Sequence, residues 1–462
     1  MKDFKNYTSV FSWRYGSEQM RMIWSEENKY KIWRKVWVEL ARAQSKEGLV
    51  GKEELADLEK NQDNISIDRI WEIEKDTRHD VVAAIKEFAE KAKIGGGKIH
   101  LGATSMDIND NAETIRISES LGIVKTKLVN LLKTFGKKIE KYADLTCMGY
   151  THLQAAEPTT LGYRFAFYAQ DLLIDLEQLK FVENNLKAKG MKGAVGTSAS
   201  YVSLLGFEKA EEMEEMVMDR LGINEVDIAN QTITRKIDLL VGNLLASIAQ
   251  SLNKFAFDLR IMQSANFGEL QEPFGEKQVG SSAMPFKRNP IKAEQICSLS
   301  RLVVNLSRIF WDNAANMLLE RTLDDSANRR VAIPEIFLSI DEMLTSATNI
   351  VEGLMINEQV IAKNLASFWM FSASELIIVE SVKKGADRQK MHEELREISM
   401  RVWEDMHQGS SNPMEDLVES NTLIRKYLTS EEILKLLDAK NHIGNAKEKA
   451  LTIVKEIDKL KA

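Results

Sequence analysis

Residues 237–262 read IDLLVGNLLASIAQSLNKFAFDLRIM, and their apolar positions recur at steps of three and four. These positions are Ile237, Val241, Leu245, Ile248, Leu252, Phe255, Leu259 and Met262. Spacing of this kind, kept over more than three heptads, predicts one long amphipathic helix. A helix of this length spans roughly 39 Å. We interpret the stripe as the seam of a helical bundle and expect it to lie between chains of an oligomer.

Similar helical patterns run over about residues 113–145, 160–187, 292–311 and 334–355. The chain has six prolines, with none before Pro158 and none between Pro158 and Pro273. Long stretches without proline permit long helices, because proline removes a backbone donor and clashes with the preceding turn. No alternating run indicates a substantial sheet. The sequence therefore predicts an all-α fold.

Three helical domains are expected from changes along the chain. Residues 1–105 carry five of the eight tryptophans, residues 106–356 hold the long-helix bundle, and residues 357–462 form a smaller helical region. At 462 residues the chain is too long for one ordinary domain.

Composition limits the classes of function. The net charge of −7 argues against general nucleic-acid binding. The first ten residues have no apolar core for a leader, and no eighteen consecutive apolar residues predict a membrane span. Cys147 and Cys297 form neither a disulfide framework nor a metal-ligand cluster, so we expect buried free thiols and a cytoplasmic protein.

The segment 280–290, GSSAMPFKRNP, carries the strongest chemical signal. Two serines in a glycine-led loop precede Lys287 and Asn289, and Pro290 opens a helix-prone stretch. Proline is favoured in the first turn of a helix, and a helix N-terminus favours bound anions. Hydroxyl, amide and ammonium groups at such a place predict a site that handles a carboxylate.

Three more polar segments lie next to predicted long helices. His79 lies between Asp76 and Asp80, where Asp76, Thr77 or Asp80 is expected to cap the following helix, or Arg78 to pair with Asp80. His100 precedes a polar loop that ends at Ser105. His152 precedes Thr159 and Thr160, either of which can cap a helix.

The string from Ser281 to Pro290, with Glu294 beyond it, resembles the signature loop of the fumarase/aspartase superfamily. Over nearly its whole length the chain resembles the adenylosuccinate lyase family. The segments that carry this resemblance are SWRYGS (12–17), KDTRHDVVA (75–83), IHLGATS (99–105), THLQAAEPTT (151–160), NQTITRKID (230–238) and ERTLDDSANRR (320–330).

This resemblance implies three helical domains, of which the middle one assembles into a tetrameric helix bundle with active sites shared between chains. It also implies a reaction without a cofactor or metal. Adenylosuccinate lyases eliminate fumarate from adenylosuccinate, giving AMP, and from the succinylated aminoimidazole carboxamide ribotide of purine synthesis.

The resemblance also implies roles for single residues. Ser281 matches the general base and His152 the general acid. Because the bundle helices are long, we expect these two residues to lie at opposite ends of one chain's bundle. The residues expected to bind substrate are Arg14, Tyr15, Arg78, His79, Asp80, Thr104, Ser105, Thr151, Gln231, Lys287, Asn289, Arg321, Ser326 and Arg330.

The expected substrate contacts divide by chemistry. Lys287 and Asn289 match the residues that face the charged carboxylate. Thr104, Ser105 and Gln231 match those that hold the succinyl part. For the ribose phosphate the match favours the arginine-rich set Arg14, Tyr15, Arg321, Ser326 and Arg330, because guanidinium groups suit phosphate oxygens. His79 is expected at the acid end or at the phosphate.

One position departs from the family pattern. Many members have an arginine after the signature glutamate, where this chain has Gln295, so Arg288 or Lys292 is expected to supply part of the nucleotide grip. Two alternatives remain open. One is another lyase of the superfamily, against which TRHDVV and ERTLDDSANRR argue. The other is a helical scaffold without catalysis, which would have no use for Ser281, Lys287, Asn289 and His152 together.

Overall fold

The computed structural model describes residues 5–275, 277–410 and 412–460. Part of the N-terminal stretch assessed for a leader, residues 1–4, lies outside the described residues. Within them the chain forms seventeen α-helices, and its only sheets are two-stranded, so the all-α prediction is confirmed. The α-helices are α1 (Glu18–Ile23), α2 (Glu26–Lys46), α3 (Lys52–Asn61), α4 (Ile67–Thr77), α5 (Asp80–Lys91), α6 (Ser105–Lys141), α7 (Leu161–Asn185), α8 (Ala199–Leu205), α9 (Phe207–Leu221), α10 (Lys236–Met262), α11 (Ile291–Ala315), α12 (Asp324–Gly353), α13 (Glu358–Lys383), α14 (Arg388–His407), α15 (Met414–Ser420), α16 (Ser430–Leu436) and α17 (Ala446–Asp458).

Short elements connect these helices. The 3₁₀ turns are η1 (Val10–Ser12), η2 (Gly96–Lys98), η3 (Ile424–Lys426) and η4 (Ala439–His442). Strand β1 (Thr146–Thr151) pairs antiparallel with β2 (Gln154–Thr160), and β3 (Leu270–Gln271) pairs antiparallel with β4 (Met355–Ile356).

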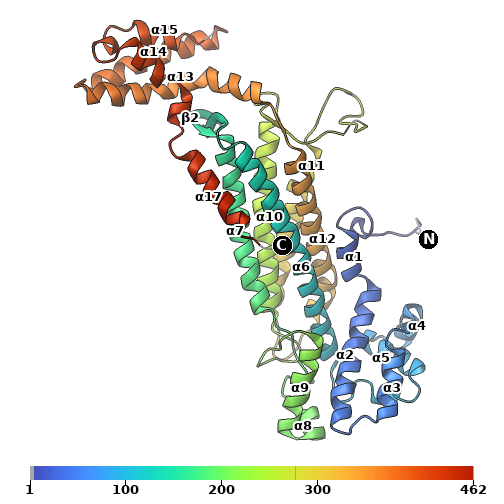
Figure 1. Ribbon diagram of the computed structural model, residues 1–462. Coiled ribbons are helices and arrows are strands. Elements are labelled where there is room, and N and C mark those ends of the chain that lie inside the picture. Colours follow the sequence, from blue (N-terminus) through green and yellow to red (C-terminus); the bar gives the residue numbers. More distant parts are fainter. Residues whose placement is uncertain (1–4, 276, 411, 461–462) are drawn as a thin grey trace. The chain divides into compact units, whose positions relative to one another are not determined.

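The chain divides into two compact units (Figure 1). Unit 1 comprises residues up to 128, 174–252 and 297–345, and unit 2 comprises residues 129–173, 253–296 and 346 onward. The boundaries fall within α6, α7, α10, α11 and α12. The expected three-domain division at residues 105 and 356 stays a prediction.

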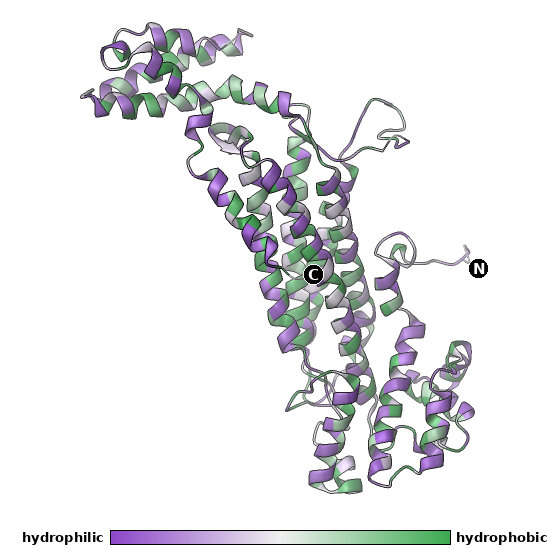
Figure 2. Ribbon diagram, in the orientation of Figure 1, coloured by the Kyte–Doolittle hydropathy of each residue, from purple (hydrophilic) through white to green (hydrophobic). Residues whose placement is uncertain are grey.

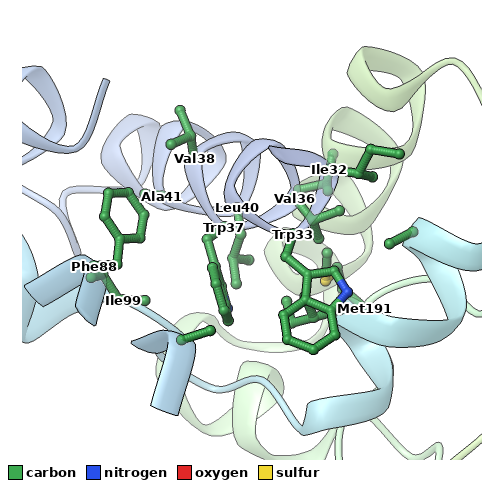
Figure 3. Close-up of a cluster of buried hydrophobic side chains, with 14 of the residues drawn as sticks. Ile32, Trp33, Val36, Trp37, Val38, Leu40, Ala41, Phe88, Ile99 and Met191 are labelled. Carbon is green, nitrogen blue, oxygen red and sulfur yellow. The ribbon is translucent and has the colours of Figure 1, made fainter. Parts of the chain in front are cut away.

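Unit 1 has an aromatic core centred on α2. Trp33 and Trp37 meet edge to face, with ring centroids 6.2 Å apart, and Trp37 reaches Phe88 of α5 (Figure 3). Met191, from the segment after α7, lies in the same buried cluster. Burial of large aromatic rings contributes much apolar area and fixes the geometry of the contacts. The N-terminal helices are thereby fixed within unit 1.

The apolar stripe of α10 does form a helix face, as expected, but it does not form a seam between chains. Seven of its eight positions, from Val241 to Met262, are buried by the chain's own helices. Figure 2 shows hydrophobic residues recurring along the long helices in this way. A different helix exposes an apolar row, since Tyr163, Phe167, Ile174 and Phe181 of α7 stay solvent-exposed. The expected position of the seam is therefore wrong.

Two predicted helix boundaries also differ from the structure. Helix α12 begins ten residues before Pro334, which lies inside it rather than at its start. An internal proline costs a helix about 3 kcal/mol, but the first turns of α12 are fastened by buried ion pairs of Asp325 and Arg329. Helix α6 begins at Ser105 and ends at Lys141, because the chain then enters strand β1.

One helix, α13, is long and apolar enough to cross a membrane by length and composition alone. Its buried side chains Trp369, Ala373 and Ile377 belong to the core of unit 2, together with residues of α14 to α16. Core helices of soluble proteins pass the same test, so this finding is weak evidence for a span.

His100 lies beside the aromatic core of unit 1. The indole N–H of Trp37 donates to His100 Nδ1 over 3.0 Å. Burial lowers the pKa of His100 to about 4, while the charge of Asp107 opposes this lowering and that of His79 adds to it. The imidazole is therefore neutral in the folded protein at pH 7.

This neutral histidine predicts an acid-sensitive fold. Because its pKa is lower in the folded state, this histidine binds a proton more readily in the unfolded state, and acid therefore favours unfolding. The free energy of unfolding should therefore fall as the pH drops from about 6.5 toward about 4, by roughly 1.4 kcal/mol for each step of one in pH. Urea denaturation across this range measures the fall. His100→Gln, which keeps an acceptor for Trp37, should make the free energy of unfolding depend less on pH. His392→Gln, at an exposed position, should leave the pH dependence unchanged. Equal pH slopes for His100→Gln and wild type would contradict the prediction.

Candidate active site

The signature loop, residues 273–290, connects β3 to α11 in unit 2. Its two arms lie against each other. A Cβ atom at Gly280 would lie 2.0 Å from the carbonyl oxygen of Lys287, so only glycine fits there. The side-chain amide of Asn289 donates to the carbonyl oxygen of Gly280 over 2.9 Å. Asn289 thus closes the loop and joins its basic arm to its serine arm.

Ser281 lies inside this closed loop. Its Oγ accepts the backbone N–H groups of Ala283 at 3.3 Å and Met284 at 3.1 Å. Donors that point at an oxygen stabilise negative charge on it. Lys287, on the opposite arm, has an exposed side chain. The loop therefore carries a hydroxyl whose oxygen accepts two backbone N–H groups, and a solvent-accessible cation.

The start of α11 already holds an anion from within the chain. The carboxylate of Glu272, only 2% exposed, accepts the N–H groups of Lys292 and Ala293 at 3.2 and 3.0 Å. Burial raises the pKa of Glu272, and these two N–H donors oppose the rise. We expected this helix N-terminus to take a bound anion, but a side chain of the protein occupies it. Glu272 instead links the two ends of the signature loop.

His152 lies at the tip of a hairpin, where the sequence predicted only a polar loop before a helix. His152 and Leu153 form a two-residue turn between Thr151 and Gln154, with φ angles of 54° and 61°. Both angles are in the left-handed region, which costs a residue with a Cβ roughly 1–2 kcal/mol. The Asn-Gly or Asp-Gly pair that usually marks such a turn is missing.

Thr160 does cap α7, as expected, because its Oγ1 accepts the N–H of Tyr163.

A pocket of about 470 Å³ lies beside the exposed His152. Its walls include Tyr163 and Phe167 of α7 and the polar group of Lys254 and Asp258. Lys254 pairs with Asp258, whose carboxylate also accepts the hydroxyl of Tyr168. The catalytic histidine expected from the sequence therefore borders a cavity with both apolar and charged walls.

A buried carboxylate holds the hairpin in place. Glu269 is fully buried and accepts hydrogen bonds from Tyr150 of β1, Arg164 of α7 and Asn364 of α13, at 3.0–3.3 Å. Burial and the Glu269 charge raise the pKa of the Tyr150 phenol, which therefore stays a donor. Tyr150 is two residues from His152, so this network fixes strand β1, which ends one residue before the histidine.

A second pocket, of about 150 Å³, lies within unit 1 and is lined by many basic side chains. Four expected substrate-binding residues line it: Asp80, Arg321, Ser326 and Arg330. The charged lining residues that sequence reasoning missed include Glu26, Lys29, Glu113, Arg116 and Arg235. In all, six basic and four acidic side chains line the pocket, which leaves an excess of positive charge. We call it the cationic pocket.

The arginines of this pocket are oriented by carboxylates. Arg321 Nη1 donates to Asp325 Oδ1 over 2.9 Å, and Arg330 Nη2 donates to Asp80 Oδ2 over 2.7 Å. Burial would raise the pKa of each carboxyl, but the neighbouring arginines dominate and hold both values below their usual range. Arg329, buried at 6% exposure, pairs with Asp238, so it supports the pocket wall.

His79 has a local role that the sequence did not reveal. It is itself the N-cap of α5, because its Nδ1 accepts the N–H of Val82 at 3.4 Å. The expected capping by Asp76, Thr77 or Asp80 is wrong. Arg78 ends α4 with a φ of 50°, and Asp80 pairs with Arg330 rather than with Arg78. These contacts direct Asp80 into the cationic pocket.

The remaining expected residues of unit 1 lie outside the walls of that pocket. Thr104 and Ser105 start α6, where the N–H of Thr104 donates to Asp107 over 3.0 Å. The N–H of Gln231 donates to the carbonyl oxygen of Glu320 over 3.2 Å. Arg14 and Tyr15 follow η1, with the guanidinium 5.8 Å from the Tyr15 ring centroid.

Of the two basic residues proposed to compensate for Gln295, Lys292 lies in the first turn of α11 and Arg288 just before this helix. The Lys292 ammonium donates to Gln295 Oε1 over 3.1 Å, and the Arg288 guanidinium lies 5.3 Å from the ring centroid of Phe274. Their part in a nucleotide grip stays a prediction. Among the described residues, no group of three or more His, Cys, Asp or Glu side chains is placed to hold a metal ion.

Comparison with known sequences identifies the family. Residues 14–305 match the family described as Lyase, and residues 371–450 match the family described as Adenylosuccinate lyase C-terminus. The adenylosuccinate lyase of Saccharomyces cerevisiae is 36% identical, covering 99% of this chain and 95% of its own. That of Methanocaldococcus jannaschii is 38% identical, covering 96% and 95%. The chain belongs to the adenylosuccinate lyase family.

Solved structures show that this fold extends beyond adenylosuccinate lyases. A 3-carboxy-cis,cis-muconate lactonizing enzyme from Pseudomonas putida superposes with a TM-score of 0.87 at 22% identity, covering 98% of this chain and 99% of its own. A fumarate lyase from Mesorhizobium sp. BNC1 gives 0.85 at 21% identity, covering 97% and 99%. At such identities the likeness concerns the fold alone.

The anchoring role of Glu272 can be tested directly. Glu272→Ala removes the acceptor for two helix N–H groups and should lower the free energy of unfolding by about 0.5–2 kcal/mol, the usual value of an N-cap. It should also speed proteolytic cleavage within the signature loop, because the two ends of the loop lose their link. Glu272→Gln keeps an acceptor oxygen and serves as the control. Cleavage of Glu272→Ala at the wild-type rate would show that the loop is held by other contacts.

Proposed function

We propose that this lyase eliminates fumarate from adenylosuccinate, giving AMP, and from the succinylated aminoimidazole carboxamide ribotide of purine nucleotide synthesis. The observation that carries the proposal is the cationic pocket with Arg321, Ser326 and Arg330 on its wall. Both substrates are nucleotides that carry a phosphate group, and guanidinium groups recognise phosphate through paired hydrogen bonds.

The proposed phosphate grip starts from arginines that are already paired. Asp80 and Asp325 hold Arg330 and Arg321 in place before the ligand arrives. A side chain held in its binding geometry loses less conformational entropy on binding. The phosphate would then share the two arginines with these carboxylates, or replace the carboxylates as their partner. The Ser326 hydroxyl would add a hydrogen bond. Arg14 and Tyr15 are proposed to complete this end, and Arg78 and His79 to border it.

At the succinyl end, Ser281 would remove the proton from the carbon next to a carboxylate. A serine hydroxyl is a weak base, so Ser281 would act as an alkoxide that has already given its own proton to solvent, and the proton from the substrate carbon would restore the hydroxyl. The negative charge of the alkoxide must be stabilised until then. The N–H groups of Ala283 and Met284 supply that stabilisation. Lys287 and Asn289 would face the substrate carboxylate on which negative charge accumulates, following the logic of an oxyanion hole. Thr104, Ser105 and Gln231 are proposed to hold the rest of the succinyl part.

His152 would donate a proton to the departing nitrogen. The hairpin presents the imidazole at an exposed turn beside its pocket, and Thr151 stands next to it on β1. A histidine can supply this proton near neutral pH because its unperturbed pKa is close to the working range. The products would be fumarate and the nucleotide amine.

Substitution of the proposed base tests this chemistry. Ser281→Ala should lower kcat by about 10²–10⁴, the usual loss for a general base, while the dissociation constant for adenylosuccinate stays near the wild-type value. The loss is confined to turnover because the hydroxyl acts on a proton and the arginines grip the ligand. The absorbance change of adenylosuccinate cleavage gives kcat, and calorimetry gives binding. Ser282→Ala is the matched control. Turnover within about tenfold of wild type would exclude Ser281 as the base.

We further propose that the enzyme is a homotetramer whose active sites are shared between chains. His152 and Ser281 both lie in unit 2, so the expectation that they lie at opposite ends of the bundle is wrong. The exposed α7 row supports sharing in another way, because Tyr163 and Phe167 belong both to it and to the wall of the His152 pocket. A chain that docks on this row would also border His152.

Free buried Cys147 and Cys297 are compatible with the proposed cytoplasmic location.

Mixing two inactive variants tests the shared site. His152→Ala and Ser281→Ala, dissociated together and reassembled, should regain a fraction of wild-type activity, because some sites then receive both intact residues from different chains. Native mass spectrometry verifies that mixed tetramers form. Each variant reassembled alone is the control and should stay inactive. Mixed tetramers without activity would assign both residues of a site to one chain.

A further inference from the structure

A buried arginine joins three segments of unit 1. Arg235, only 2% exposed, lies just before α10. Its Nε donates to Asp325 Oδ2 over 2.7 Å, and its Nη1 donates to Asp110 Oδ1 over 2.9 Å. Asp325 is the second residue of α12, and Asp110 lies in the second turn of α6. We call Asp110, Arg235 and Asp325 the buried clamp.

One end of the clamp reaches the cationic pocket. Asp325 offers one carboxylate oxygen to Arg235 and the other to Arg321, whose Nη1 lies 2.9 Å from Oδ1. The same carboxylate therefore faces two guanidinium groups. Because Arg235 shares its charge, Asp325 neutralises Arg321 only in part. Arg321 keeps positive charge for a ligand while its direction stays fixed.

The other end of the clamp reaches the segment that carries Gln231. Asp110 Oδ2 accepts the N–H of Ile233 over 2.8 Å, while Oδ1 accepts Arg235. Two further contacts join residues 230–231 to residues 319–320: the N–H of Gln231 with Glu320, and the amide of Asn230 with Leu319. The Gln231 and Arg321 segments are therefore fastened to each other by one network.

A lysine could not replace Arg235 in this arrangement. A guanidinium presents donors in a planar fork and can join two carboxylates at fixed angles, whereas an ammonium is a compact point charge. The nearby cation Arg329 makes its shorter contacts with Asp238 and Glu113, at 2.7 and 3.3 Å, and its Nη1 lies 3.9 Å from Asp110 Oδ1. Arg329 therefore adds positive charge near Asp110, whereas Arg235 donates hydrogen bonds to both Asp110 and Asp325.

We propose that Arg235 is a positioning residue for substrate binding. It holds Asp325 so that Arg321 points into the cationic pocket, and it fixes the distance between Arg321 and Gln231. This inference rests on the proposed function, in which Arg321 binds the substrate phosphate and Gln231 the succinyl part. Arg235 itself acts through Asp325 and Asp110.

A double-mutant cycle tests the inference. The variants are Arg235→Gln, Asp325→Asn and the double variant, and calorimetry gives the dissociation constants of AMP and fumarate. Arg235→Gln should weaken AMP binding by roughly tenfold, within the range of coupled contacts, and leave fumarate binding unchanged. In the Asp325→Asn background the same substitution should change AMP binding by less than about twofold, because the carboxylate that joins Arg235 to Arg321 is gone. Independent, additive losses in the two variants would overturn the inference.

Arg235→Lys carries the same test if Arg235→Gln does not fold. It keeps the charge but not the fork, and AMP binding should weaken while fumarate binding holds. The matched control is Arg34→Lys, because Arg34 is also buried and paired, with Glu87, away from the pocket walls. It should lower the melting temperature without altering the ratio of the two affinities. An equal change of that ratio in both lysine variants would reduce Arg235 to a structural residue.

The wild-type enzyme separates this inference from the proposed function. If wild type neither cleaves adenylosuccinate nor binds AMP, the proposed function fails and the inference fails with it. If wild type does both and Arg235→Lys binds AMP as tightly as wild type, the inference alone is wrong.

Discussion

Buried carboxylates hold the polar loops of this enzyme in place. In the first two turns of α6, Asp107 accepts the N–H of Thr104 and the ammonium of the fully buried Lys189, and Asp110 accepts Arg235. In unit 2, Glu269 holds the strand of His152 and Glu272 closes the signature loop. A buried charge is costly unless each oxygen has partners. These carboxylates are each satisfied by several donors, which lie on the helices, strands and loop ends next to the polar loops.

This arrangement lets exposed residues act from defined positions. His152 and Lys287 have solvent-accessible side chains, yet the segments that carry them are fixed. Glu269 holds the hairpin of His152, and Asn289 closes the loop of Lys287. The bundle helices supply the rigidity, since their apolar faces are packed within the chain. Polar side chains at helix ends can then be positioned accurately although they lie on loops. The left-handed turn at His152 is strain that such a support can maintain.

The sequence was most informative where structure is local. Steps of three and four predicted the end of α10 and placed its start within one residue, because helix periodicity depends on near neighbours. The string around Ser281 predicted the superfamily, segments such as TRHDVV and ERTLDDSANRR predicted the family, and the comparisons confirmed the family. The hairpin at His152 escaped prediction because its turn contains neither glycine nor asparagine. Pro334 misled the prediction of α12, because distant ion pairs outweigh its local preference.

The sequence by itself determined the helical class, the family and the kinds of side chain available for catalysis, because these depend on spacing and residue type along the chain. Only the tertiary structure decided which partners those side chains have. The pairing of Arg235 with Asp325 spans ninety residues, and that of Arg330 with Asp80 spans 250. It also decided that the α10 row is buried and the α7 row exposed. Both rows have spacings that place their residues on one face of a helix, and only the packing of the other helices determines which one is covered.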